Sequence, residues 1–190
     1  GRVGSIGDAV RMLGLRTVAG VLTAAAMHSS LRVDACPGFC FESYWRHALG
    51  TALLARSLAP SGGLNADEAF LAGLMHDVGL LVLAVFQPDA AVMSIKHSQE
   101  QDAPLYQAEQ EILGIAHPAV GALVANHWHF PAAISQAIAH HHAPLPPGPG
   151  ERISLSRLVQ IADALTHALD LNQDDHEAVP VIDEAAWQVL

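Results

Sequence analysis

The stretch Leu74-Met75-His76-Asp77-Val78-Gly79 places an imidazole and a carboxylate side by side inside an otherwise apolar segment. A charged group in such surroundings is costly unless it is paired with an opposite charge or coordinated to a metal ion. Neighbouring residues of a helix project about 100° apart, so both side chains can converge on one ion where a helix ends. We therefore expect a helix to end at this doublet and the partners to come from elsewhere in the chain.

Candidate partners for the doublet occur on several separate predicted helices. His47 shares a helix face with aliphatic residues in the helix predicted from about Glu42 to Ala59, and Asp163 lies in an apolar helix predicted from Ser154 to Leu169. Further donors are His117, His141 and His142. Taken singly, Asp163 fits a helix cap or an arginine partner, and His47 fits a packed core histidine. Their joint occurrence favours a divalent metal site, because neutral imidazole and carboxylate oxygen are suitable ligands.

Composition excludes some functions and singles out histidine. The chain has 190 residues and a formal net charge of −10, and Lys96 is its only lysine. Because a nucleic-acid surface needs clustered Lys and Arg, we expect no nucleic-acid partner. Twelve histidines against nine Lys plus Arg is an unusual ratio, and imidazole is the commonest metal ligand. Four of the histidines are expected to be surface or packing residues, namely His28, His97, His167 and His176.

Cysteine usage and the absence of a targeting signal favour a cytoplasmic protein. Cys36 and Cys40 are the only cysteines, too few for a zinc knuckle, and are expected to be free thiols in a reducing compartment. Every run of eighteen residues that is otherwise apolar contains a charge or a glycine, so we expect no membrane partner. No signal peptide is expected either. Because the chain opens on Gly1, we expect an excised domain or a longer region before it.

Hydrophobic periodicity predicts an all-α fold in one domain over residues 1–190. Asn65 followed by Glu68 predicts a capped helix that ends at the His-Asp doublet, and Gly79 is expected to let the chain turn there. Leu80 to Phe86 fits a helix or a buried strand, and we assign a helix because no partner strand is evident. The other predicted helices are 5–13, 17–27, 89–101, 104–113, 117–128, 132–141 and 183–190. A Pro/Gly loop covers 143–150.

The order of these motifs resembles the HD superfamily of metal-dependent phosphohydrolases, and more specifically the HDOD domain, a signal-transduction output domain related to HD-GYP proteins. The residues that carry the resemblance are Ser5–Gly14, Tyr44–His47, Phe70–Gly79, Glu109–Gly114, His117–Ala122, Trp128–Pro131, His141–Pro144 and Ile161–Asp163. The resemblance implies a bacterial, single-domain helical bundle of the HD type.

The resemblance also implies a set of metal ligands. The core ligands would be His47, His76, Asp77 and Asp163, and a second metal would be held by His117, His141 and His142. Asp77 would bridge the two metals and is the candidate catalytic residue. His140 matches the family doublet less well than its two neighbours. The implied cofactor is one or two divalent transition-metal ions, with Fe, Mn, Zn, Co and Ni all open.

Two departures from the catalytic relatives leave the function open. Leu80 stands where HD-GYP proteins carry a lysine, and Ala143–Gly150 replaces their Gly-Tyr-Pro signature. One hypothesis is a regulatory module that contacts signalling proteins or a covalently linked sensor domain. Another is a metal-dependent phosphohydrolase, phosphodiesterase-like, that acts on a nucleotide or cyclic dinucleotide. A third is a helical protein whose histidines are coincidental.

Overall fold

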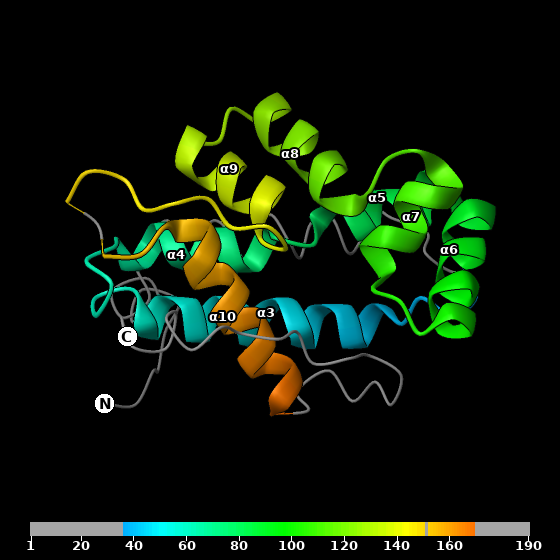
Figure 1. The fold of residues 1–190 in the computed structure, drawn as a ribbon, viewed down its shortest axis with the longest axis horizontal. Coiled ribbons are helices and arrows are strands. Elements are labelled where there is room, and N and C mark those ends of the chain that lie inside the picture. Colours follow the sequence, from blue (N-terminus) through cyan, green and yellow to red (C-terminus); the bar gives the residue numbers. More distant parts are fainter. Residues whose placement is uncertain (1–35, 151, 170–190) are drawn as a thin grey trace, which may run out of the picture. The chain divides into compact units, whose positions relative to one another are not determined.

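The structure is a computed structural model that describes residues 36–150 and 152–169 (Figure 1). These residues are helices joined by turns and loops, and no strand occurs among them, so the predicted all-α class is confirmed. They all lie in one compact unit that begins at Arg32. The helices predicted over 5–13, 17–27 and 183–190 lie outside the described residues, and the single domain over 1–190 stays a prediction.

The described helices agree with the predicted ones to within two residues at each end. They are α3 (Phe41–Leu58), α4 (Ala66–Met75), α5 (Val78–Phe86), α6 (Pro88–Gln101), α7 (Leu105–Leu113), α8 (His117–His127), α9 (Ala132–His140) and α10 (Leu155–Ala168). Local signals explain several ends. Asn65 accepts hydrogen bonds from the backbone N–H groups of Asp67 and Glu68, as predicted for an N-cap. Gly114 ends α7 in the left-handed conformation, with φ of 72°.

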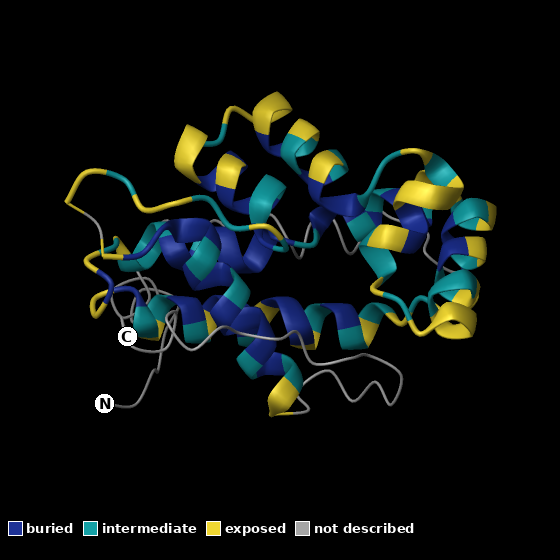
Figure 2. Ribbon diagram, viewed as in Figure 1, coloured by how far each residue is buried: buried dark blue, intermediate teal, exposed yellow. Residues whose placement is uncertain are grey.

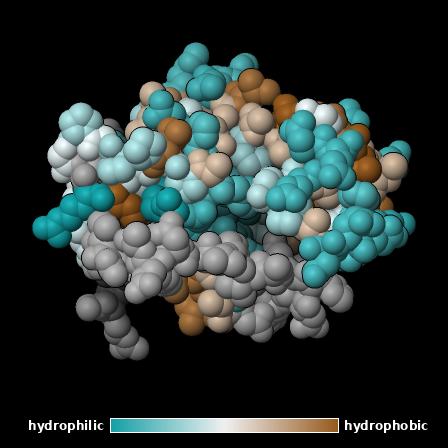
Figure 3. Space-filling model, viewed as in Figure 1, coloured by the Kyte–Doolittle hydropathy of each residue, from teal (hydrophilic) through white to brown (hydrophobic). Residues whose placement is uncertain are grey.

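Helix α4 lies between α9 and α3 in Figure 1. It packs against α3, α9 and α10, while α5 packs against α8 and α6 against α7 (Figure 1). Figure 2 shows buried residues along α4 and where α3 and α10 meet it. The largest fully buried side chains in the core include Phe70, Leu74, Leu81, Ile134, Ile138, Leu158 and Ile161. On the face in Figure 3, the hydrophobic side chains of the described residues are interspersed with hydrophilic ones.

Two glycines near the doublet let neighbouring helices approach closely. A Cβ on Gly73 would lie 2.9 Å from the Cα of Ala52, which brings α4 against α3. A Cβ on Gly79 would lie 2.0 Å from the carbonyl oxygen of His117, which brings α5 against α8. The expectation that Gly79 forms the turn is therefore wrong. The chain turns at Asp77, and Gly79 lies inside α5 because no side chain fits between it and α8.

The stretch Ala66–Phe86 is long and apolar enough to cross a membrane by length and composition alone, with a mean hydropathy of 2.1. We expected no span. Of the most apolar window in this stretch, 67% is buried inside the structure, as in a core helix, and the stretch is broken between α4 and α5.

Candidate metal centre

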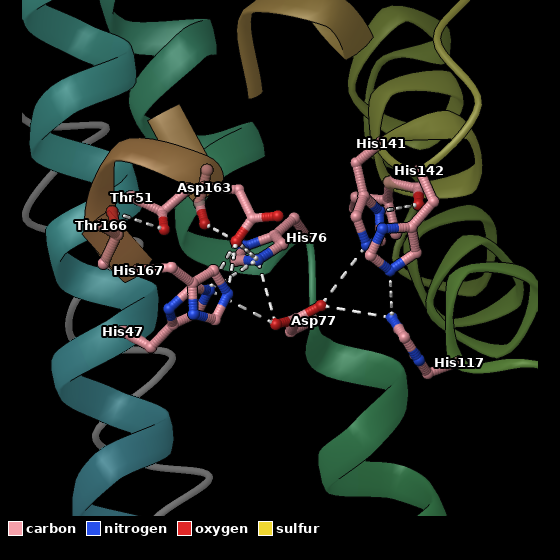
Figure 4. Close-up of polar contacts among 12 residues, drawn as sticks. His47, Thr51, His76, Asp77, His117, His141, His142, Asp163, Thr166 and His167 are labelled. Carbon is pink, nitrogen blue, oxygen red and sulfur yellow. Dashed lines mark hydrogen bonds and ion pairs between the residues drawn. The ribbon is translucent and has the colours of Figure 1, made fainter. Parts of the chain in front are cut away.

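Asp77 occupies the break between α4 and α5 and faces donors on two sides. Its backbone, with φ −100° and ψ 14°, lies in the bridge region between the helical and extended conformations, where the two helices are separated. Oδ2 lies 3.0 Å from His76 Nε2, whereas Oδ1 lies 3.4 Å from His117 Nε2 and 3.5 Å from His141 Nε2. Figure 4 shows the carboxylate between two groups of imidazoles.

The first group, here the first cluster, consists of His47, His76 and Asp163. The Nε2 atom of His47 lies 3.0 Å from Asp163 Oδ1 and 3.2 Å from His76 Nε2. His76 Nε2 is 3.9 Å from the same oxygen of Asp163, and His47 Nε2 is 3.7 Å from Asp77 Oδ2. The structure therefore brings together the four residues that the resemblance implies as core ligands, from α3, α10 and the α4–α5 junction.

The second group, here the second cluster, consists of His117, His141 and His142. These residues come from the first turn of α8 and from the end of α9. His117 Nε2 lies 3.1 Å from His142 Nε2, and the three side chains can hold one ion because their donor atoms lie within 4.8 Å of one another. His140 is absent from this group, in line with the weaker match noted for it.

Hydrogen bonds on the far side of the rings orient the donor atoms toward Asp77. His76 Nδ1 lies 2.7 Å from the carbonyl oxygen of Gly73, and His141 Nδ1 lies 2.8 Å from that of Ile138. Because a carbonyl oxygen can only accept, Nδ1 carries the proton in both rings. In the neutral imidazole, Nε2 then has a free lone pair, as a metal ligand requires.

Glu109 has the same role for His117. Sequence reasoning placed it in a motif of the resemblance but gave it no role in the site. Its Oε2 atom accepts hydrogen bonds from the backbone N–H and from Nδ1 of His117, both 2.7 Å long. The Glu109 side chain is only 3% exposed, so this is a buried carboxylate–imidazole pair. The sequence alone does not show that Glu109 is buried and paired, because its spacing of eight residues from His117 is not typical of any motif.

His167 is a second residue to which sequence reasoning gave no role in the site. We expected a surface or packing residue, and its ring does pack, 4.5 Å from that of His47. In addition, its Nε2 atom lies 3.2 Å from Asp163 Oδ1. Asp163 and His167 are four residues apart on α10, a spacing that puts both on one helix face. By contrast, His97 is partly exposed and pairs with Glu111, as expected of a surface residue.

Charge and burial set the protonation of the centre. Burial raises the pKa of Asp77, but His76 and His141 outweigh burial and hold that pKa well below the usual range. Burial lowers the pKa of His76, but Asp77 and Asp163 outweigh burial and raise it to about 9. Burial, His141 and His117 lower the pKa of His142 to about 2, which keeps this imidazole neutral and its lone pair available.

The donor atoms fit divalent ions. A metal ion about 2.1 Å from two N or O ligands leaves those ligands about 3.0–3.4 Å apart at octahedral or tetrahedral angles, close to the shortest spacings in both clusters. His141 Nε2 is buried, and among the described residues its approach to Asp77 Oδ1, at 3.5 Å, is too long for a good hydrogen bond, which is costly without another ligand. His47, His76, Asp77 and Asp163 would hold one ion, and the second cluster would hold another on the other oxygen of Asp77.

Comparison with protein families identifies the chain. The model of the HDOD domain matches residues 1–144. The chain belongs to the HDOD family. The resemblance inferred from the motifs is thus confirmed. All donors of this HDOD chain from His47 to His142 lie within the matched range, whereas Asp163 and His167 follow it.

Solved structures share the fold of this HDOD chain. An HDOD domain protein of unknown function from Geobacter sulfurreducens is 25% identical, with a TM-score of 0.77 over 100% of this chain and 65% of its own. A candidate phosphohydrolase from Shewanella amazonensis SB2B is 26% identical, with a TM-score of 0.72 over 99% and 66%. A candidate signal transduction protein from Marinobacter aquaeolei VT8 is 27% identical, with a TM-score of 0.76 over 99% and 42%.

The HDOD chain spans about a third of the length of the curated relative that it matches. That relative is an uncharacterized protein of Treponema pallidum (strain Nichols), 25% identical over 177 residues, which make up 92% of this chain and 34% of the relative.

Proposed function

We propose that this HDOD chain is a signal-transduction output module that retains a divalent-metal centre and acts mainly through regulation and protein contacts. The observation that carries the proposal is the convergence of buried imidazoles and carboxylates from α3, α8, α9, α10 and the α4–α5 junction on Asp77 (Figure 4). Ions held there would join helices that are far apart in the sequence. Because metal binding free energy adds to folding free energy, metal occupancy would set how firmly these helices pack.

The surroundings of the centre favour regulation over catalysis. Of the side chains that form ion pairs there, Asp77 is the most exposed at 13%, and the others are at 7% or below, which leaves little access for a substrate. Leu80 also stands at the position where the catalytic relatives carry lysine.

The partners would be signalling proteins or a covalently linked sensor domain. One similar solved structure is named as a candidate signal transduction protein, which supports this assignment.

The test compares metal-loaded protein with the Asp77→Ala variant. When the wild type is loaded with metal, exchange of the backbone amide hydrogens should slow in α3, α8, α9 and α10. Adding metal to the variant should leave the exchange rates unchanged. In parallel, both proteins are incubated with p-nitrophenyl phosphates, nucleotides and cyclic dinucleotides. The proposal expects no metal-dependent turnover. Turnover that is lost in Asp77→Ala would overturn it.

A second candidate function is metal-dependent hydrolysis of a phosphoester in a nucleotide or cyclic dinucleotide. The observation that favours it is the position of Asp77, whose two oxygens face separate donor clusters, as a two-metal hydrolytic site requires. A pair of divalent ions there would act as Lewis acids toward phosphoryl oxygens. The similar structure named as a candidate phosphohydrolase also supports this function. The same substrate panel decides between the two functions.

A further inference from the structure

We propose that His167 is a direct ligand of the metal in the first cluster, which would then have five protein donors: His47, His76, Asp77, Asp163 and His167. The inference rests on the metal-binding part of the proposed function. It adds a ligand beyond the set implied by the family motifs, and its helix, α10, lies wholly after the matched range.

The first argument is geometric. The donor atoms of His47, Asp163 and His167 lie within 4.8 Å of one another. Oδ1 of Asp163 is 3.0 Å from His47 Nε2 and 3.2 Å from His167 Nε2. Two ligands of one ion are expected about 3.0–3.4 Å apart, so the distance to His167 matches that of the implied ligand His47.

The second argument concerns the imidazoles around Asp163. Nε2 of His47, at 3.0 Å, and Nε2 of His167, at 3.2 Å, both lie within hydrogen-bond distance of Oδ1, and His76 Nε2 lies farther away at 3.9 Å. Two imidazoles thus direct the same ring nitrogen at one buried carboxylate oxygen, and imidazole nitrogen with carboxylate oxygen is a donor set that divalent metals accept. A cation among them would use the lone pairs of these rings together with the carboxylate charge.

The third argument is that His167 is held in place. The side chain is 7% exposed, although the residue lies in the last turn of α10. The preceding residue, Thr166, receives a buried hydrogen bond from Thr51 of α3 and donates one to the carbonyl oxygen of Ala162. This chain of hydroxyl groups ties the end of α10 to the helix that carries His47, so little side-chain entropy remains to be lost on ligation.

With five protein donors, the metal at the first cluster would differ from the metal at the second cluster in the number of protein ligands. An octahedral ion held by five side chains would have one coordination site left for solvent, so protein side chains would supply most of its coordination. The second cluster supplies His117, His141 and His142 with the other oxygen of Asp77, and so leaves more sites open. The first ion would therefore stabilise the helix packing, and the second would be the exchangeable one.

The experiment separates a ligand from a hydrogen-bond donor. Co(II) is titrated into the metal-free full chain, and its visible absorption is recorded for wild type, His167→Gln and His167→Ala. Gln preserves a donor near the Nε2 position but lacks the imidazole lone pair. A ligand predicts weaker Co(II) binding at one of the two positions in both variants, by more than the about 10-fold that loss of an outer-shell partner can cost, with a changed Co(II) spectrum. The matched control, His97→Gln, removes a surface imidazole and should leave binding unchanged.

Each other outcome has a defined meaning. Wild-type affinity and spectrum in His167→Gln would overturn the inference, since the residue would then act only as a donor to Asp163. Circular dichroism of the metal-free variants checks that they fold, and the Gln variant serves if the Ala variant does not. If the wild-type chain binds no Co(II), the proposed metal centre itself fails. A failure of the His167 assignment alone leaves the wild type binding normally.

Discussion

Glu109 accepts two hydrogen bonds from His117, one from the backbone N–H and one from the ring Nδ1. The pair fixes the start of α8 and the orientation of the ring with a single buried carboxylate. His76 and His141 are oriented by backbone carbonyl groups instead. Of these three rings, His117 alone is therefore oriented by a side chain that mutation can remove.

Removal of Glu109 should weaken the second cluster. Glu109→Ala leaves two buried N–H groups of His117 unpaired and should cost about 2–4 kcal/mol of stability. Glu109→Gln keeps an acceptor but loses the charge and should weaken metal binding at the second cluster about 10- to 100-fold. Isothermal titration and chemical denaturation measure the two effects. Glu111→Gln, on the exposed side of α7, is the matched control, and equal affinities for both Gln variants would contradict the assigned role.

Alanine at Gly79 or Gly73 should affect different halves of the centre. A Cβ on Gly79 would lie 2.0 Å from the carbonyl oxygen of His117, so α5 and α8 must separate. Overpacking of this severity should cost about 3 kcal/mol or more. Thermal unfolding measures the loss, and metal titration should show the second cluster impaired first. Gly73→Ala moves α4 from α3 and should impair the first cluster first; the reverse pattern would refute this account of the packing.

The Thr51–Thr166 hydrogen bond should respond unequally to its two deletions. Thr166→Val leaves the buried hydroxyl of Thr51 without its acceptor and should cost about 1–3 kcal/mol. Thr51→Val removes the donor, but Thr166 still donates to Ala162, so the cost should be smaller. Urea denaturation of the metal-free protein measures both. The double variant should be less destabilised than the sum of the single ones, and strict additivity would count against the bond.

Metal binding at neutral pH should release protons. The pKa of His76 in the metal-free protein is about 9, so this ring is protonated at pH 7. A metal ion needs the lone pair of Nε2 and must displace that proton. The heat of metal binding is measured at pH 7 in two buffers of different ionisation enthalpy. The difference between the two heats, divided by the difference between the two ionisation enthalpies, should therefore correspond to the release of about one proton or more. Identical heats would mean that no proton leaves.

The helices and most residues of the metal centre could be predicted from the sequence. Apolar periodicity and caps such as Asn65 act locally, so the bounds of the helices followed from the residues themselves. The convergence of His47, Asp77 and His117 followed from the order of motifs rather than from local signals.

The residues missed have partners that are distant or ambiguous in the sequence. Glu109 and His167 depend on contacts with His117 and Asp163 that become visible only when helices pack. The function of Gly79 was also misread, because a glycine after a helix end fits a turn as well as a close helix contact. The carbonyl oxygen of His117, 38 positions later, decides between these readings.

The central claim is that Asp77 bridges two metal positions, and anomalous diffraction from crystals of the metal-loaded protein tests it most directly. The account predicts two anomalous peaks at the absorption edge of the added metal, each within about 2.3 Å of a different carboxylate oxygen of Asp77. One peak should be surrounded by His47, His76 and Asp163, and the other by the second cluster. Crystals of fully loaded protein with no peak beside Asp77 would contradict the account.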